Sequence, residues 1–379
     1  MIISSLVVVI IIVYLILIGA LVYGFDKVDD YKLQDLKPKA RFSIIIPFRN
    51  EAKYLNKLLN SLSQLNYPQS LFEVILVDDD SEDDSIQIIN KVLKRNNRLA
   101  HIITVIKNDR RTSSPKKDAI TSAITTSRYE WIITTDADCI LPKFWLDTFD
   151  EFIQTQNPNC IVGPVIYNRA NSFFNRFQIL DFLSLQGATI GGFGLHLPFL
   201  CNGANFGYRK SVFKDVDGFY GNNKIASGDD IFLLEKFINH DAKKVGYLKS
   251  MKAIVTTNPV SGFRQLIQQR LRWASKTSHT SNWFSKCVGL IVLLGNLACA
   301  TMIPLLLLDL LSTKIVLSSF IIKFSIDFLL LFKVSRFFNQ ENVLPSYILS
   351  SLIYPFFSVY ISLLSFFMSY SWKGRTFRK

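Results

Sequence analysis

The stretch FSIIIPFRNEAKYLNKLLNSLSQLNYPQSLFEVILVDDDS, residues 42–81, decides the fold. It holds two short apolar runs, 42–48 and 72–79, with a helix predicted between them over 51–65. Both runs are apolar throughout, which is typical of strands covered on both faces of a parallel sheet. Polar and acidic residues directly follow each run. Because open α/β sheets bind ligands beyond the carboxyl ends of their strands, this stretch predicts a β-α-β unit with a ligand site beside it.

The same alternation continues downstream. Helices are predicted over 84–97 and 116–127, and further β runs over 101–107 and 131–138. Strands that alternate with helices in this way predict repeated β-α-β units and a mostly parallel sheet. The fold class is therefore α/β, and the domain is expected to extend over residues 39–259.

The composition points to a membrane protein. The 379 residues are 49% hydrophobic and 19% charged, against about 25% charged in soluble proteins. Lys and Arg exceed Asp and Glu by 43 − 30 = 13, an excess that suits anionic lipid or a phosphorylated substrate. No recognition helix or basic, aromatic-rich sheet indicates nucleic acid as a partner. The five scattered cysteines form no C-x-x-C pair, so they are expected to be buried thiols.

Uncharged tracts at both ends predict membrane helices. Residues 1–25 contain a tract long enough to cross a bilayer of about 30 Å. That tract lacks a basic start and a clear cleavage site, which favours a retained anchor over a signal peptide. In the C-terminal third, the tracts 287–308, 315–332 and 343–371 predict a bundle of about three spans over 287–371.

The segments around this bundle raise a conflict over topology. Residues 260–286 are basic and amphipathic, so interfacial helices are predicted there, and 372–379 form a basic tail. Three spans would put the domain and the basic tail on opposite sides, although basic segments prefer the cytoplasmic side. A hairpin around Pro355, or one apolar helix that lies in the interface, would resolve the conflict.

Three smaller features carry expectations of their own. The glycine-rich segment 191–194 is expected to be flexible, and Lys323 and Asp327 are expected to pair on one helix face, away from lipid. The remaining basic residues of the amphipathic segment are expected to face solvent or lipid headgroups. These are Arg264, Arg270 and Lys276.

Four polar clusters stand at the ends of predicted elements: 47–51, 78–81, 136–138 and 228–230. Any one of them is more often a turn or a helix cap than a site. Together on one sheet edge their carboxylates would repel, so a cation is expected among them, and a divalent metal bridging a diphosphate fits. Asp136 and Asp138 are two apart, so on a strand both would face one site. Their hard oxygen ligands select Mg²⁺ or Mn²⁺ over zinc.

Six motifs now occur in order: IPFRNE, VDDDS, TDADC, CNGANFGYRK, SGDDIFLLE and QQRLRWASKT. Over roughly residues 40–285 this succession resembles the family 2 glycosyltransferases, in particular processive membrane enzymes such as hyaluronan, chitin and cellulose synthases. The resemblance implies a Rossmann-like GT-A domain for nucleotide-diphospho-sugars together with transmembrane helices. It also implies a metal-dependent, inverting transfer from a UDP-sugar, with glucose or N-acetylglucosamine foremost, to a growing polysaccharide or glycan.

The resemblance assigns the donor side of the site. Pro47, Arg49 and Glu51 match the nucleotide motif after the first strand, and Asp79 matches the acid that reads uracil. Lys116 falls in a segment that is G-K-x-x-A in the family and begins with proline here, which leaves open whether Lys116 or its neighbour contacts the nucleotide.

The resemblance also assigns the reaction centre. Asp136 and Asp138 match the D-x-D that meets the ribose and the metal-bound diphosphate. Asp230, preceded by Asp229, matches the general base.

The acceptor side follows from two further motifs. Asn202 and Gly203 fall in the acceptor loop, and Gln269, Arg272 and Trp273 form the Q-x-x-R-W motif that closes the site. Arg272 would also help to neutralise the departing nucleotide, and Trp273 would stack on a sugar ring. In isolation, a tryptophan on an amphipathic helix is more often a membrane-interface anchor.

Two other functions stay open. Single-sugar transfer to a lipid acceptor suits the interfacial helices, and a nucleotide-sensing transporter has only the Lys323–Asp327 pair in its favour, since a sensor needs no general base. The expected partners are a UDP-sugar, a glycan or lipid acceptor and membrane lipids, with accessory export subunits left open. The expected location is the plasma (inner) membrane, multi-pass, with a cytoplasmic catalytic domain.

Overall fold

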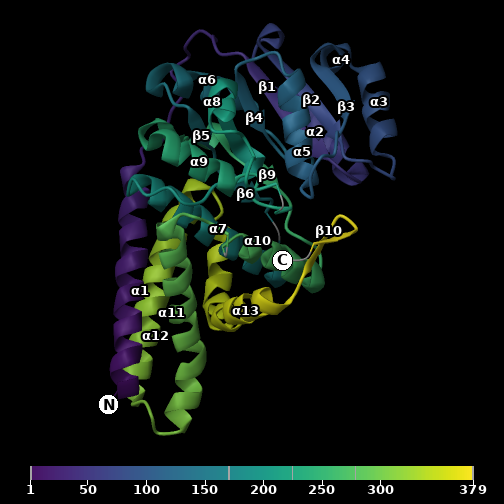
Figure 1. The fold of residues 1–379 in the computed structure, drawn as a ribbon. Coiled ribbons are helices and arrows are strands. Elements are labelled where there is room, and N and C mark those ends of the chain that lie inside the picture. The colour runs from purple at the N-terminus through teal and green to yellow at the C-terminus, as the bar shows by residue number, and fades with distance from the viewer. Residues whose placement is uncertain (1, 170, 224, 278, 378–379) are drawn as a thin grey trace. The chain divides into compact units, whose positions relative to one another are not determined.

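The computed structural model describes residues 2–169, 171–223, 225–277 and 279–377 (Figure 1). The chain forms two compact units. The sheet unit comprises Asp29–Asn168 and Leu200–Asn258. The helical unit comprises Met1–Val28, Arg169–Phe199 and Pro259–Lys379, as far as these are described. Arg378 and Lys379 of the predicted basic tail lie outside the described residues.

The sheet unit is built on a seven-stranded sheet in the order β3-β2-β1-β4-β7-β5-β8. Strands β3, β2, β1 and β4 are mutually parallel, and β7 runs antiparallel to both β4 and β5. The predicted α/β class with a mostly parallel sheet is therefore confirmed. The strands are β1 Phe42–Phe48, β2 Phe72–Asp78, β3 Ile103–Lys107, β4 Trp131–Thr134, β5 Cys160–Val162, β7 Phe206–Arg209 and β8 Val245–Tyr247, with a small parallel pair, β6 Val165–Tyr167 and β9 Val255–Thr257.

Helices connect these strands and cover the sheet. They are α2 Ala52–Ser63, α3 Ser85–Arg95, α4 Asn97–Ile102, α5 Pro115–Thr126, α6 Trp145–Gln156, α8 Lys210–Asp215 and α9 Ile231–Asp241, with 3-10 turns η1 Gln69–Leu71, η2 Gly203–Asn205, η3 Ala242–Lys244 and η4 Met251–Ala253. Because both faces are covered, Ile44, Ile45 and Ile46 in β1 are completely buried. This burial explains why the run is apolar without alternation.

Three predicted strands are shorter in the structure, and the run 72–79 ends one residue early, at Asp78. The run 101–107 loses its first two residues to α4, because the Asn96 side chain accepts a hydrogen bond from Leu99 N and starts a short helix. β4 ends at Thr134, so Asp136 and Asp138 lie in the turn that follows. Placing the two carboxylates on one strand face was therefore wrong.

The helical unit contains α1 Ile2–Lys27, α7 Phe173–Gly194, α10 Phe263–Thr277, α11 Trp283–Leu307, α12 Thr313–Phe337, η5 Glu341–Ser346 and α13 Tyr347–Phe367, followed by the hairpin β10 Tyr370–Trp372 and β11 Arg375–Phe377. By length and composition, four of the described helical segments could cross a membrane: α1, α11, α12 and Glu341–Phe367. This number matches the predicted anchor plus three spans.

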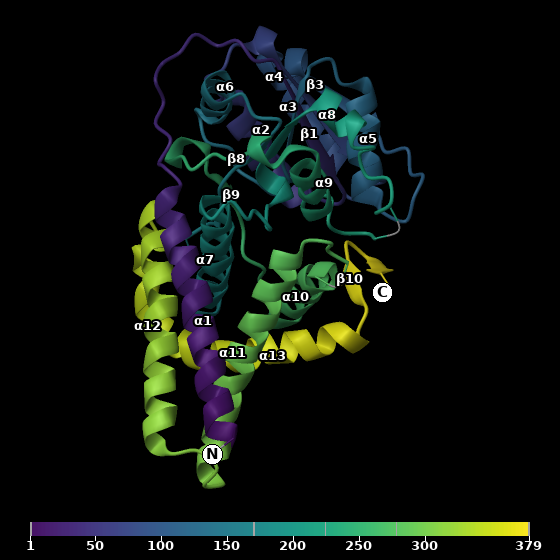
Figure 2. The ribbon, with the colours of Figure 1, turned by 60° about the vertical axis from the view of Figure 1, so that its left-hand side comes forward.

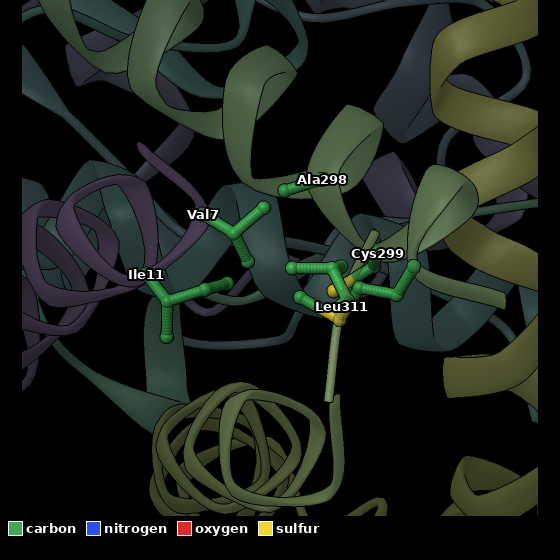
Figure 3. Packing of buried hydrophobic residues seen from close by; sticks show 6 residues of the cluster. Val7, Ile11, Ala298, Cys299 and Leu311 are labelled. Atoms are coloured by element: carbon green, nitrogen blue, oxygen red, sulfur yellow. The ribbon is translucent and has the colours of Figure 1, made fainter. Parts of the chain in front are cut away.

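One of these helices has a different direction. α1, α11 and α12 run alongside one another, whereas α13 lies across them (Figures 1 and 2). α13 also continues through Pro355 as one helix, so a hairpin there was wrong. Side chains of α1 and α11 interlock with Leu311 after α11; Figure 3 shows Val7 and Ile11 facing Ala298, Cys299 and Leu311.

The glycine-rich segment 191–194 is the last turn of α7, not a flexible loop. It is glycine-rich because α7 crosses α1 with backbone against backbone. A Cβ on Gly191 would lie 2.4 Å from Leu21 O, and one on Gly194 would lie 1.8 Å from Gly24 O. Neither distance is compatible with a side chain, so the glycines set the approach of the two helices.

Gly191→Ala is expected to lower the free energy of unfolding by about 1–3 kcal/mol, since the added methyl group meets a backbone carbonyl that cannot move aside. Gly19→Ala is the matched control, because a Cβ there meets no atom within 4 Å. Alanine favours a helix by about 1 kcal/mol over glycine, so the control should be neutral or stabilising. Thermal unfolding in detergent measures both, and a Gly191→Ala variant as stable as the control would contradict the tight crossing.

Candidate active site

Lys116 stands at the centre of the acidic clusters of the sheet unit. Its Nζ lies 2.8 Å from Asp136 Oδ1 and 3.0 Å from Asp229 Oδ2, and its side chain is 16% exposed. Burial alone would lower the pKa of Lys116, but the Asp136 and Asp229 carboxylates outweigh it and raise that pKa above its ordinary value. The lysine is therefore charged at neutral pH. A cation was predicted among the clusters, and the chain itself supplies one.

The local fold decides which of two neighbouring lysines reaches the site. Pro115 occupies the first position of α5, and Lys116 follows it toward the acids. Lys117 points elsewhere: it is 1% exposed, and its Nζ donates to Asn222 O at 2.7 Å and Ile225 O at 2.9 Å. Of the two lysines, Lys116 is therefore the one among the acids.

Asp230 is held by backbone amides on both of its carboxylate oxygens. Oδ1 accepts from Ile231 N at 2.8 Å, which makes Asp230 the N-cap of α9, and Oδ2 accepts from Gly203 N at 3.2 Å. The side chain is nearly buried. A capping residue fixed in this way has one defined orientation, which suits a general base as well as a cap.

Gly203 brings the main chain into the acidic cluster. A Cβ at this position would lie 2.9 Å from Asp229 Oδ2 and 3.4 Å from Lys116 Nζ, so a larger residue would press on both. Thr134 Oγ1 donates to Gly203 O at 2.8 Å and ties this loop to β4. Asn202 Oδ1 accepts from Ala204 N at 3.0 Å and caps η2. The acceptor-side role of Asn202 and Gly203 stays a prediction.

The predicted base-reading acid, Asp79, directly follows β2 and is buried. Its Oδ1 accepts from Arg110 Nε at 2.6 Å and from Asn108 Nδ2 at 2.8 Å. Neither of these partners was among the predicted site residues. Both directly follow β3, so the rule that ligands gather after parallel strands pointed to them as well.

The other residues predicted for the nucleotide side lie at the end of β1 and contact the loop after β2. Arg49 Nη1 donates to Asp79 O at 2.9 Å, and its Nη2 donates to Glu82 Oε1 at 2.8 Å. The buried Glu51 donates its backbone N–H to Ser85 Oγ at 2.9 Å. Pro47 lies beyond Ile45, the last β1 residue paired with β4, where a proline costs no hydrogen bond to that strand.

Asp136 and Asp138 have the donor chemistry for a hard divalent cation. Both are half-buried in the turn after β4, which Cys139 N closes by donating to Asp136 O at 3.2 Å. Among the described residues, no group of three or more His, Cys, Asp or Glu is placed to hold a metal. Mg²⁺ is commonly held by one or two carboxylates together with substrate phosphates and water, so these two residues fit a metal that arrives with its diphosphate.

The Q-x-x-R-W residues belong to the helical unit. Gln269, Arg272 and Trp273 are half-buried on α10. Arg264 is exposed, but Arg270 and Lys276 are 6% and 8% exposed, so the expectation that both face solvent or headgroups was wrong. The predicted Lys323–Asp327 pair is confirmed at 2.7 Å, and Tyr14 OH donates to Asp327 Oδ1 at 2.7 Å.

Two family models match the chain and together cover most of it. Residues 43–217 match the model described as glycosyl transferase family 2. Residues 131–373 match the model described as glycosyl transferase family group 2, from β4 of the sheet unit through the C-terminal helices. The second match alone covers more than half of the 379 residues.

Similar proteins agree with these models. The poly(ribitol-phosphate) beta-N-acetylglucosaminyltransferase TarS of Staphylococcus aureus is 30% identical over 199 residues, 52% of this chain but 33% of that protein. The poly-beta-1,6-N-acetyl-D-glucosamine synthase of Staphylococcus epidermidis is 22% identical over 267 residues, 68% of this chain and 61% of that protein. The chain thus matches only a third to three fifths of their lengths.

A solved structure shares the fold. The mannosyltransferase PcManGT of Pyrobaculum calidifontis, determined with GDP-Man and Mn²⁺, superposes with a TM-score of 0.59 at 13% identity. The superposition covers 92% of this chain and 99% of that one.

Proposed function

Since the chain belongs to the family 2 glycosyltransferases, we propose that it transfers a sugar from a UDP-sugar to a glycan acceptor at the membrane, with inversion at the anomeric carbon. The observation that carries this proposal is the cluster of Lys116, Asp136, Asp229 and Asp230 at the carboxyl ends of the parallel strands. It combines an oriented carboxylate with a half-buried cation.

Each part of this cluster suits one part of the reaction. The Asp230 carboxylate takes the proton of the acceptor hydroxyl, whose oxygen bonds to the anomeric carbon while the bond to the diphosphate breaks. Lys116 offers a fixed positive charge to the departing UDP. Mg²⁺ or Mn²⁺, held by Asp136 and Asp138, would supply further charge neutralisation at the diphosphate. One displacement with one base inverts the configuration.

The donor and acceptor are proposed by analogy with the similar proteins. N-acetylglucosamine comes first, since the names of both bacterial relatives contain it, and glucose comes second. Asp79 is proposed to read the uracil base, with Arg110 and Asn108 fixing its carboxylate. Gln269, Arg272 and Trp273 are proposed to complete the site on the acceptor side. A lipid acceptor is the second candidate, favoured by the largely exposed apolar side chains of α13.

The direction of α13 supports a membrane topology. We propose that α1, α11 and α12 cross the bilayer and that α13 lies in its interface (Figure 2). With three crossings, the segments that precede and follow the sheet unit in the sequence lie on the same side of the bilayer. The segment after α13 lies on that side too. That side carries Lys27, Lys333 and Arg336 at helix ends, which indicates the cytoplasmic side of the inner membrane. The conflict between the domain and the tail then disappears.

The first experiment is nucleotide release by the detergent-purified chain. UDP-N-acetylglucosamine, UDP-glucose, UDP-galactose, UDP-glucuronate and GDP-mannose are offered separately, each with Mn²⁺, with Mg²⁺ or with EDTA. UDP release from UDP-N-acetylglucosamine, lost in EDTA, is the expected result, because the diphosphate needs its cation to leave. Folded protein that binds no nucleotide under any of these conditions would overturn the proposal.

A further inference from the structure

A buried ion pair joins two helices of the helical unit. Asp181 of α7 and Arg270 of α10 lie 2.6 Å apart between Oδ2 and Nε, and their side chains are 6% and 7% exposed. They are 89 residues apart in the sequence. Burying both charges has a desolvation cost that apolar residues of the same size would avoid. A pair of this kind is therefore poorly explained by stability alone.

Arg270, which Asp181 holds in place, contacts two residues of the Q-x-x-R-W motif. Its Nη1 donates to Gln269 Oε1 at 2.5 Å, and its guanidinium lies 4.2 Å from the centre of the Trp273 ring. Asp181 holds the guanidinium from the other helix. The orientation of Gln269 and Trp273 thus depends on a carboxylate that does not belong to the motif.

The backbone at the start of α10 is fixed by the same helix. Gln178 of α7 donates through Nε2 to Val260 O at 3.0 Å and accepts through Oε1 from Val260 N at 3.1 Å. Leu266 and Leu271 are each 1% exposed. α7 therefore supports α10, and Asp181 supplies a charged contact beside the motif.

We infer that Asp181 is a positioning residue for sugar transfer: through Arg270 it fixes Gln269 and Trp273. The inference rests on the proposed function, in which these residues complete the site. A misplacement of about 1 Å in such residues costs about 100-fold in rate. Asp181→Asn is thus expected to lower kcat for UDP release about 100-fold, while KM for the donor changes little. Because Arg270 stays charged and buried, this variant should also unfold at a lower temperature, so its kcat is measured on the folded fraction. Asp181→Glu, which keeps the charge, should recover much of the loss.

A double variant separates positioning from packing. Asp181→Leu with Arg270→Leu removes both charges and fills the space with apolar atoms, so folding should be preserved. Its kcat should stay low, because the guanidinium that contacts Gln269 and Trp273 is then absent. Asp26→Asn is the matched control: it changes the same group in an exposed ion pair of the same unit, with Lys333 at 2.9 Å, and should leave kcat unchanged.

Trp273 gives a readout that does not need activity. The emission of Trp273 is obtained by subtracting the emission spectrum of each protein with Trp273→Phe added from the spectrum of the protein without that change. Asp181→Asn should change this emission, and Asp26→Asn should not. Wild-type kcat in Asp181→Asn, full kcat in the double variant, or unchanged Trp273 emission would overturn the inference. If the wild type binds no nucleotide, the proposed function is overturned instead. The Trp273 emission of Asp181→Asn then still tests whether Asp181 positions Trp273.

Discussion

Asp230→Asn is expected to lower the rate of sugar transfer by about 100-fold to 10,000-fold, the range that a general base contributes. The carboxylate is the part of the cluster with a fixed orientation and a basic oxygen for the acceptor proton. Asparagine caps helices as well as aspartate does, so α9 should keep its start. The variant should therefore fold and still bind UDP.

Two measurements check this result: UDP release under saturating donor, and UDP binding by calorimetry. Asp241→Asn is the matched control, because Asp241 caps η3 by accepting from Lys243 N at 3.0 Å, outside the acidic cluster. The control should keep wild-type turnover. If Asp230→Asn also keeps it, Asp230 is a cap alone, and the base lies elsewhere.

Much of the sheet unit was predictable because its strands are buried on both faces. Continuous apolar runs such as 42–48 leave few alternatives, and β1 has the predicted bounds. Where a capping residue intervened, the prediction failed: Asn96 starts α4 two residues into the expected third strand. A single capping hydrogen bond decides here between helix and strand. The spacing of apolar residues in the sequence does not reveal such a bond.

The site was predictable only as far as its residues follow strand ends. Asp79 and Asp136 follow β2 and β4, as the strand-end rule predicts, whereas Asp230 caps α9, at the helix start that its motif predicted. The choice between Lys116 and Lys117 was beyond the sequence, since it depends on the helical turn that begins at Pro115. The position of Lys116 between Asp136 and Asp229 was likewise not evident from the sequence, which indicated a cation among the carboxylates without indicating a lysine.

The helical unit was the least predictable part. A basic residue on an amphipathic helix usually faces water, and only a tertiary contact with Asp181 makes Arg270 a buried residue. Likewise, α13 has the length and composition of a span whether it crosses a bilayer or lies along it. Length and composition limit what a helix can do, and its packing decides between the remaining options.

Lys116→Met is expected to destabilise the sheet unit by about 3 kcal/mol, at the low end for a broken buried pair because Asp136 is 38% exposed. Without the lysine, Asp136 and Asp229 face each other with no cation between them. A divalent cation would replace the lost charge. Mg²⁺ or Mn²⁺ should therefore raise the unfolding temperature more in the variant than in the wild type.

The neighbouring lysine supplies the control for this last prediction. Lys117→Met also removes a buried ammonium group, whose Nζ donates to the carbonyl oxygens of Asn222 and Ile225 and lies 5.1 Å from the centre of the Phe232 ring. Its loss should destabilise the chain without creating a surplus of negative charge, so a divalent cation should restore nothing. The unfolding temperatures of the wild type, Lys116→Met and Lys117→Met are measured with and without Mg²⁺. The comparison distinguishes the effect of losing a charge from the effect of losing packing. Equal metal effects in both variants would show that Lys116 is a packing residue, and the charge balance of the site would have to come from elsewhere.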